Sequence, residues 1–145
     1  MTIGVDTDVL VNWLMNGAPD HLAARRFLQE QVGAGEQLGL APQVIFELVH
    51  IVSDTRRFER ALPIKDALDA ARTLWDAPET TRLSPAPGML HRTLELMGSA
   101  KLGRKRILDT ALAATLEGAG ITRLATFNAK DFRAFPFLEI VDPRG

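Results

Sequence analysis

Residues 2–10, with the sequence TIGVDTDVL, contain the feature around which the rest of the chain is interpreted. The apolar run Ile3–Val5 is typical of a buried strand, and the apolar spacing from residue 9 to residue 14 predicts a helix that follows directly. Asp6 lies at the junction between them. Because ligands bind at the carboxyl ends of strands in open α/β sheets, Asp6 is either a helix cap or the first residue of a site.

The remainder of the chain alternates between predicted helices and predicted strands. The apolar spacing predicts further helices that begin near residues 19, 42, 63, 87 and 107, the one from residue 42 ending near Arg57 or Phe58. Four further strands are expected at residues 37–41, 80–84, 121–126 and 138–141. This alternation predicts one α/β domain spanning residues 1–145, with a parallel sheet flanked by helices.

The composition narrows the class of protein. The chain has 145 residues, a formal net charge of −1 and no cysteine, which excludes disulfide scaffolds, cysteine zinc sites and a generally basic nucleic-acid-coating protein. It contains neither the roughly 20 apolar residues of a membrane span nor the basic and apolar segments of a signal peptide. We therefore expect a soluble cytoplasmic protein with no membrane partner.

Two further acids lie in apolar surroundings. Glu47 and Asp109 each share a predicted helical face with apolar residues of the same helix. Each has an ordinary explanation, because Glu47 could reach water at the edge of its face and Asp109 could pair with Lys105 or Arg106. Together with Asp6, however, they belong to elements that an α/β fold would bring together, and buried carboxylates are usually paired or bind a cation.

The segment 126–132, with the sequence TFNAKDF, follows the predicted strand at residues 121–126 and can face the same edge of the sheet. Asn128 followed three residues later by Asp131 resembles a helix N-cap with an acidic third residue. Capping and membership of the site are both open for Asp131.

The chemistry of these side chains predicts a hard-cation site. The converging groups are carboxylates, and none of the three histidines is spaced as a metal ligand. An oxygen-only site suits Mg²⁺, with Mn²⁺ as a substitute, better than zinc.

The sequence resembles PIN domains, and among them the VapC-type toxins of bacterial toxin–antitoxin pairs. The residues that carry the resemblance are Val5–Leu10, Phe46–Leu48, Ile107–Asp109 with Ala113–Ala114, and Leu124–Phe132. The resemblance implies a parallel α/β sheet with a small inserted helical hairpin and a Mg²⁺-dependent endoribonuclease. It also implies a homodimer and a cognate antitoxin that inhibits the toxin. Trp13 and Phe27 are candidates for the antitoxin groove, with core packing as the alternative.

The resemblance also assigns roles to site residues. It implies that Asp6, Glu47 and Asp109 are the core acids, and that Asn128 stands at a position that is often Asp. Thr126 matches a small hydroxyl residue beside the site, and we expect Thr126 and Asn128 to orient water or phosphate. Asp131 is a candidate to compensate for Asn128. Asp8 stands where the family commonly has Asn, which adds an acid close to Asp6.

Basic residues are the candidates for RNA binding, because an acidic site needs cations nearby to attract a polyanion. The segment before Asp109 supplies Lys101, Arg104, Lys105 and Arg106. A second cluster, at residues 56–60, has ordinary solvated charges as its alternative explanation.

Three other functions are compatible with the sequence. The chain could be a PIN nuclease of RNA processing, a non-catalytic RNA-binding module on a decayed PIN fold, or a Mg²⁺-dependent phosphatase with an aspartate nucleophile. The substitution of Asn128 for an acid favours the decayed module, and the intact set of Asp6, Glu47 and Asp109 disfavours it.

Overall fold

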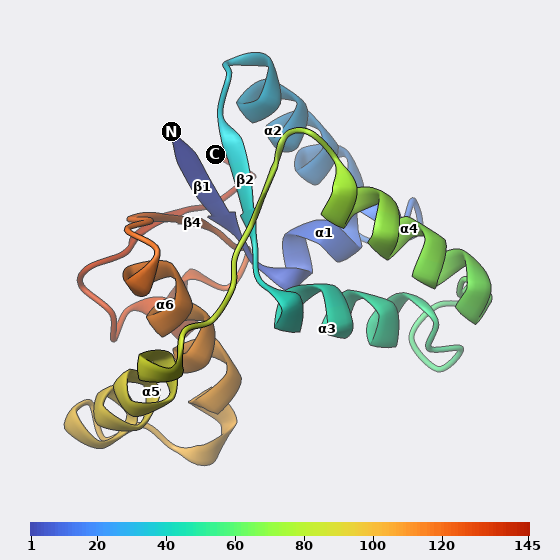
Figure 1. The fold of residues 1–145 in the computed structure, drawn as a ribbon. Helices are drawn as coiled ribbons and strands as arrows, with labels where there is room; N and C mark the ends of the chain where they lie inside the picture. The colour runs from blue at the N-terminus through green and yellow to red at the C-terminus, as the bar shows by residue number, and fades with distance from the viewer.

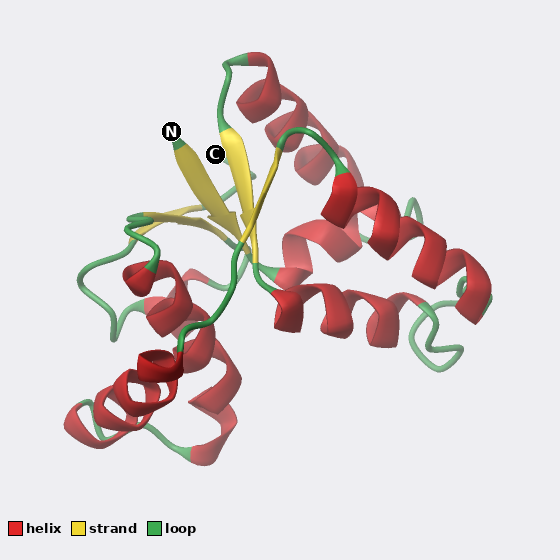
Figure 2. Ribbon diagram, viewed as in Figure 1, coloured by secondary structure: helices red, strands yellow, loops and turns green.

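Five parallel strands form the centre of the molecule in the order β3-β2-β1-β4-β5 (Figures 1 and 2). The computed structural model describes all 145 residues. The strands are β1 (Thr2–Val5), β2 (Gln37–Leu40), β3 (Thr80–Arg82), β4 (Arg123–Ala125) and β5 (Glu139–Val141). The strand order reverses at β1, so β1 and β4 flank the point where α/β sheets most often bind ligands.

Six α-helices cover the sheet in two groups (Figure 1). In chain order they are α1 (Thr7–Leu14), α2 (His21–Gly33), α3 (Pro42–Val52), α4 (Ile64–Asp76), α5 (Pro87–Ser99) and α6 (Ile107–Gly118). Helices α1 to α4 pack on one another, and α5 packs on α6. Two short 3₁₀ helices, η1 (Arg104–Arg106) and η2 (Ala129–Phe132), precede α6 and follow β4 respectively. None of the helices combines the length and apolar composition needed to cross a lipid bilayer.

The predicted α/β class and the parallel sheet are confirmed, but the predicted end of the third helix is wrong. Helix α3 ends at Val52, several residues before Arg57. The Ser53 hydroxyl donates to the Val49 carbonyl oxygen, and the Asp54 carboxylate accepts from the Arg56 amide. These side chains satisfy backbone groups locally and so favour a turn over a further helical turn.

Leucines that contribute to the helical spacing of α5 do not lie in the core. Leu90 and Leu94 are more than half exposed, whereas Thr93 and Leu96 are the buried residues of this helix. Thr93 can be buried because its hydroxyl donates to the Met89 carbonyl oxygen. The leucine stripe is therefore left on the surface of the molecule.

Gly4, in the middle of β1, allows α6 to pack directly on the sheet. A Cβ atom at this position would lie 2.7 Å from a methyl group of Leu116 and 3.3 Å from the Arg123 carbonyl oxygen. Leu116 is itself fully buried, so its side chain has little room to move away.

We expect Gly4→Ala to lower the free energy of unfolding by about 1–3 kcal/mol, the usual cost of overpacking a core. Gly98→Ala is the matched control, because a Cβ at Gly98 in α5 would meet no atom within 4 Å. The control should leave stability unchanged or raise it slightly, because alanine favours helix. Urea unfolding of both variants measures the difference, and equal stabilities would contradict the packing argument.

Candidate active site at the carboxyl edge of the sheet

Asp6 caps a helix with one carboxylate oxygen and is held from the β4 side through the other. It is the N-cap of α1, where its Oδ1 atom accepts a hydrogen bond from the Thr7 amide at 2.8 Å. Its other oxygen, Oδ2, accepts from the Thr126 hydroxyl at 2.8 Å, and its own amide donates to the Ala125 carbonyl oxygen. The carboxylate is thus fixed by α1 on one side and by the residues after β4 on the other.

Thr126 is fully buried, which differs from the expectation that it orients water or phosphate. Its hydroxyl donates to Asp6 and accepts from the backbone N–H of Asn128 at 3.1 Å. Since its side chain has no exposed surface in this conformation, Thr126 holds Asp6 in place and does not face the solvent.

Asn128 does not use its side chain to cap η2, as its spacing from Asp131 had suggested. Its Nδ2 group instead donates to Oδ2 of Asp8 at 2.9 Å, an interaction that joins residues 120 positions apart. A carboxylate is a stronger acceptor than a backbone group, which explains why the amide turns toward Asp8. The site therefore contains a paired Asp8 and Asn128.

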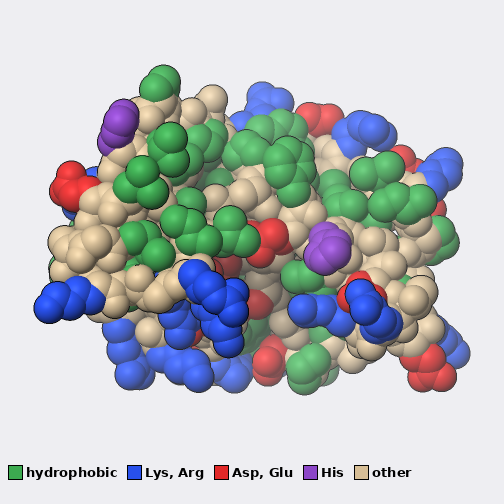
Figure 3. All heavy atoms as spheres, turned by 90° about the horizontal axis from the view of Figure 1, so that it is seen from below, with side chains coloured by type: hydrophobic (Ala, Val, Ile, Leu, Met, Phe, Trp, Pro, Cys, Tyr) green, Lys and Arg blue, Asp and Glu red, His purple; other side chains and the backbone are tan.

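Glu47 and Asp109 reach the same place from two different helices. Helix α3 begins directly after β2, and Asp109 lies in the first turn of α6. An open cleft of about 320 Å³ at this edge has Asp6, Asp8, Glu47, Asp109 and Asn128 among its lining residues. Figure 3 views this face and shows acidic side chains near its centre, with Lys and Arg side chains on both sides and the largest group of them at the lower left.

The pKa values of the core acids show uncompensated negative charge. Burial raises the pKa of Asp6, and the negative charges of Glu47 and Asp131 add to the rise, although the hydrogen bonds to Asp6 oppose it. Burial also raises the pKa of Glu47, with the charge of Asp109 as the second cause. The neighbouring Thr7 hydroxyl lowers the pKa of Glu47 in part, without forming a full hydrogen bond.

The two other acids show larger rises. Burial raises the pKa of Asp109 to about 6, helped by the charges of Asp6 and Asp131 and opposed by Arg106. Burial and then the charge of Asp6 raise the pKa of Asp8 to about 7. Burial and mutual repulsion thus outweigh the cations near these carboxylates.

Asp131 has a cation of its own. Arg106 Nη1 contacts the Asp131 carboxylate at 2.5 Å and lies 3.7 Å from Oδ2 of Asp109. The predicted alternative pairing of Asp109 with Arg106 is therefore present, and Asp109 still lines the cleft. Arg106, one of the four expected RNA-binding residues, turns toward the acids of the site.

The donor set fits a hard divalent cation. All of the groups are oxygen donors, their charges are clustered and unbalanced, and Oδ1 of Asp8 is buried without a hydrogen-bond partner. No three acidic or histidine side chains are already arranged as a metal-ligand cluster in this conformation. Binding of a cation would therefore require side chains of the cleft to reorient.

The raised pKa values predict how stability depends on pH in the metal-free protein. In the unfolded chain the reference pKa of Asp8 and Asp109 is 3.8, whereas in the folded protein the pKa of Asp8 is about 7 and that of Asp109 about 6. The carboxyl groups of Asp8 and Asp109 therefore bind protons more tightly in the folded state than in the unfolded state. Their contribution to stability is fully present below about pH 4. That contribution is lost as the pH rises through about 6 and 7.

We expect the melting temperature in chelator to fall between about pH 5 and pH 7.5, and to fall less in the Asp8→Asn variant. The acids with a lowered pKa, such as Glu117 and Asp142, titrate below this range and do not alter the sign. Thermal unfolding followed by circular dichroism tests this, and a melting temperature that rises over the interval would contradict the charge distribution.

Two residues that the sequence did not single out also shape the site. Asn12 of α1 lines the cleft, donates from Nδ2 to the Asp8 carbonyl oxygen and accepts from the Asp20 amide. Arg144 donates to the Phe127 carbonyl oxygen and lies 5.2 Å from the centre of the Phe127 ring. An amide on an otherwise apolar helix could have indicated Asn12, whereas nothing in the sequence indicates Arg144.

The surface around the cleft carries the remaining predicted residues. Lys101, Arg104 and Lys105 are exposed and form no ion pair, so their charges are available to a polyanion. In the second basic cluster, Arg57 lines the cleft but is paired with Asp54. Phe27 is buried in the core, which favours the packing alternative for that residue.

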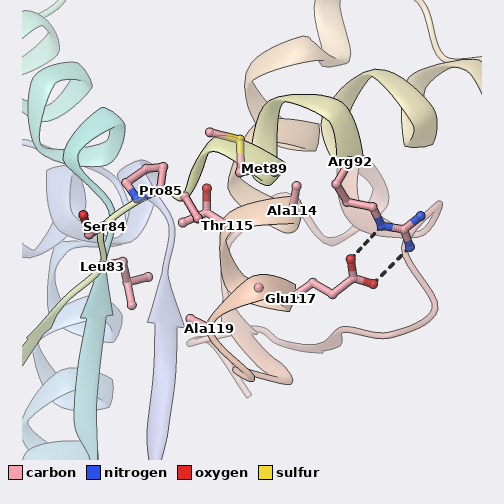
Figure 4. A pocket seen from close by; sticks show the side chains of 12 residues that line it. Leu83, Ser84, Pro85, Met89, Arg92, Ala114, Thr115, Glu117 and Ala119 are labelled. Atoms are coloured by element: carbon pink, nitrogen blue, oxygen red, sulfur yellow. Dashed lines mark hydrogen bonds and ion pairs between the residues drawn. The ribbon is translucent and has the colours of Figure 1, made fainter.

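A second cavity, of about 260 Å³, shares no lining residue with the cleft (Figure 4). It lies between α6 and the segment that connects β3 to α5. On its wall, the Arg92 guanidinium donates to both oxygens of Glu117, at 2.7 and 3.0 Å, and also to Glu95. Because these charges satisfy one another, the cavity presents no free charged group to a ligand.

Comparisons with known proteins identify related sequences and folds, although no family model matches the chain. The chain is 27% identical over 141 residues to Ribonuclease VapC24 of Mycobacterium tuberculosis, a match that covers 97% of this chain and 96% of that protein. It is 26% identical over 138 residues to Ribonuclease VapC33 of the same organism, covering 95% of each chain.

Solved structures share the fold along most of the chain. VapBC-1 from nontypeable Haemophilus influenzae matches with a TM-score of 0.72 at 16% identity, covering 100% of both chains. Mycobacterium tuberculosis VapC20, described as a Sarcin-Ricin loop cleaving toxin, matches with a TM-score of 0.66 at 17% identity, covering 84% of this chain and 86% of that chain. FitAcB from Neisseria gonorrhoeae matches with a TM-score of 0.65 at 16% identity, covering 99% and 98%.

Proposed function

We propose that the chain is a metal-dependent endoribonuclease, supported by its similarity to the VapC ribonucleases over almost its whole length and by the fold that it shares with VapBC toxins. We propose further that it acts as the toxin of a toxin–antitoxin pair in the cytoplasm. RNA is its substrate, and Mg²⁺, for which Mn²⁺ can substitute, is its cofactor.

One observation carries the proposal. Asp6, Glu47 and Asp109 come from three separate elements and line one cleft at the carboxyl edge of the sheet. Their pKa values are all raised, mainly by burial and partly by one another's charge. Groups perturbed in this way and gathered in a cleft are typical of functional sites, and their oxygen-only chemistry suits a hard cation.

The three core acids would hold the metal, each with a different degree of constraint. Asp6 is the most fixed, since the Thr126 hydroxyl and the Thr7 amide each hold one of its oxygens. Glu47 and Asp109 are partly exposed and can turn toward the cleft. A bound Mg²⁺ supplies Lewis-acid stabilisation of the phosphate and lowers the pKa of a coordinated water, which makes hydrolysis feasible at neutral pH.

The exposed basic residues would bring RNA to this acidic cleft. We expect replacement of Lys101, Arg104 and Lys105 by glutamine to weaken RNA binding. The slope of log affinity against log salt should flatten by about 2, because each phosphate that is no longer neutralised reduces the slope by roughly 0.7. The same change at Arg26, an exposed residue of α2, should leave the slope unchanged. Fluorescence anisotropy at several salt concentrations measures both, and an unchanged slope in the triple variant would contradict the assignment.

The exposed apolar residues beside the cleft support a homodimer. Phe46, next to Glu47, is 71% exposed, and Leu108, next to Asp109, is 53% exposed. The Gln43 side chain of α3 donates to the Leu108 carbonyl oxygen and joins these two parts of the surface. Large exposed apolar side chains gathered in this way are typical of a protein interface.

A cognate antitoxin is the proposed inhibitory partner. Matching structures that contain more than the toxin support this partner. They include VapBC2 from Rickettsia felis, described as bound to a DNA fragment from its promoter, and FitAB, described as bound to a DNA fragment. A further matching fold is described as a toxin–antitoxin complex from Klebsiella pneumoniae. The antitoxin would have to cover the cleft or exclude RNA from it.

Induced expression of the chain in bacteria tests the proposed function. Growth should stop and RNA should be cleaved in cells that express the wild type, whereas the Asp109→Asn variant should permit growth. RNA cleavage without growth arrest would favour a processing nuclease. RNA binding with no cleavage in Mg²⁺ or Mn²⁺ would favour a non-catalytic module, and a phosphorylated aspartate trapped during turnover would favour a phosphatase.

A further inference from the structure

We infer that Asp8 supplies the fourth metal-binding carboxylate of this site and that Asn128 serves to position it. The inference rests on the proposed metal-dependent function. It assigns to Asp8 the negative charge that Asn128 cannot provide.

The hydrogen bonds of Asp8 fix one of its oxygens and leave the other free. Oδ2 accepts from the Asn128 side chain at 2.9 Å and from the Phe127 amide at 3.1 Å. Oδ1 is buried and has no hydrogen-bond partner. A buried carboxylate oxygen without a donor is unusual in a folded protein and indicates a group that is completed by a ligand.

Asp8 also shares its surroundings with Asp6. The Thr126 hydroxyl oxygen lies 2.8 Å from Oδ2 of Asp6 and 3.4 Å from Oδ2 of Asp8. A hydroxyl has a single proton and can donate it to only one of them. Two carboxylates are therefore held against one small group, both at the lining of the cleft, and a divalent cation would balance their charges.

Asn128 is oriented so that its side chain holds Asp8. Its NH₂ group faces Asp8, since only a donor can face a carboxylate, and its neutral side chain brings no negative charge to the site. Asn128 is the donor and Asp8 the acceptor of one hydrogen bond. The negative charge of this pair therefore belongs to residue 8, in α1, and not to residue 128, after β4.

Asp131 is the competing candidate, and its surroundings differ in the decisive respect. Its carboxylate is already paired with Arg106 at 2.5 Å, so its charge is balanced by the protein. Asp8 forms no ion pair of this kind, and its Oδ1 makes no full hydrogen bond, although the Val9 amide lowers the pKa of Asp8 and the charge of Arg144 acts on it from farther away.

The test is a reciprocal exchange. Mn²⁺ binding is measured by isothermal titration and by electron paramagnetic resonance, on full-length protein stripped with chelator. We expect Asp8→Asn to weaken Mn²⁺ binding by about tenfold or more, the usual effect of removing a group around a bound metal. The double variant Asp8→Asn with Asn128→Asp keeps the hydrogen bond and the total charge, and should recover affinity to within about threefold of wild type.

Two comparison variants make the result specific. Asp69→Asn, on the exposed face of α4, should bind Mn²⁺ as the wild type does, and Asp131→Asn should lose less affinity than Asp8→Asn. Circular dichroism confirms that each variant is folded. A double variant that binds Mn²⁺ as weakly as Asp8→Asn would overturn the inference, because moving the charge would not rescue a merely structural Asp8. A larger loss of Mn²⁺ affinity in Asp131→Asn would assign the role to Asp131.

Failure of the inference and failure of the proposed function give different results. A wild-type protein that binds Mn²⁺ and cleaves RNA, with an Asp8→Asn variant that binds Mn²⁺ equally well, overturns only the assignment of Asp8. A wild-type protein that neither binds Mn²⁺ nor cleaves RNA in Mg²⁺ overturns both.

Discussion

Replacing Asp6 by asparagine is expected to slow RNA cleavage in Mg²⁺ by about two to three orders of magnitude, the typical effect of removing one essential electrostatic group from a catalytic site. Asparagine has nearly the same shape and can still accept the hydrogen bond of the Thr7 amide. The variant therefore loses the charge at the centre of the cleft while it keeps the cap of α1. Single-turnover cleavage of a defined RNA measures the change.

The same variant should remain folded, and this separates a catalytic effect from unfolding. Because burial raises the pKa of Asp6, its negative charge costs free energy in the metal-free protein. We therefore expect Asp6→Asn, in chelator at neutral pH, to melt at the temperature of the wild type or above it. A cleavage rate within about tenfold of the wild-type rate would show that Asp6 is a structural cap alone.

Replacing Phe132 by alanine is expected to have the largest effect on stability, lowering the free energy of unfolding by about 3–5 kcal/mol. The ring is 1% exposed, and its centre lies 6.2 Å from that of Phe135, which is equally buried. Phe132 ends η2, so it also ties the segment that carries Asn128 and Asp131 to the core. Chemical unfolding in urea measures the decrease.

Leu22→Ala provides the matched control, because Leu22 is 74% exposed on α2. Its removal should change the free energy of unfolding by no more than about 0.5 kcal/mol. Should Phe132→Ala cost less than about 1 kcal/mol, the segment after β4 would not be anchored in the way the packing indicates.

The parts of the site that could be predicted from sequence are those with a local signal. Asp6 was identifiable because a carboxylate ended a short apolar strand, and Glu47 and Asp109 because each interrupted an apolar helical face. The structure shows that Asp6 caps α1 with one oxygen and also lines the cleft, so the capping role does not exclude the proposed role in the site.

The parts that could not be predicted depend on contacts between distant residues. The hydrogen bond from Asn128 to Asp8 spans 120 positions, and the pairing of Arg106 with Asp131 depends on how η1 lies against η2. In isolation, Asn128 fits a helix cap and Arg106 fits a free RNA-binding cation. Only the fold shows that each is occupied by an acid of the site.

The surface leucines of α5 illustrate a different limit. Apolar residues at helical spacing indicate a face that is kept from water, but they do not reveal whether the covering surface belongs to the same chain. Leu90 and Leu94 contribute to the helical spacing but lie outside the core, while Thr93 is buried with its hydroxyl satisfied by the helix itself.

The most direct test of metal-dependent hydrolysis at this cleft is cleavage of a defined RNA at increasing Mg²⁺ concentration, with the chemical ends of the products mapped. We predict no cleavage in chelator, cleavage that saturates with Mg²⁺, and products without 2′,3′-cyclic phosphate, because a water is the expected nucleophile. A substrate with a 2′-deoxy sugar at the cleaved position should also be cut. Cleavage that persists in chelator, or that leaves 2′,3′-cyclic phosphate, would contradict the assignment of the carboxylates to a metal-dependent site.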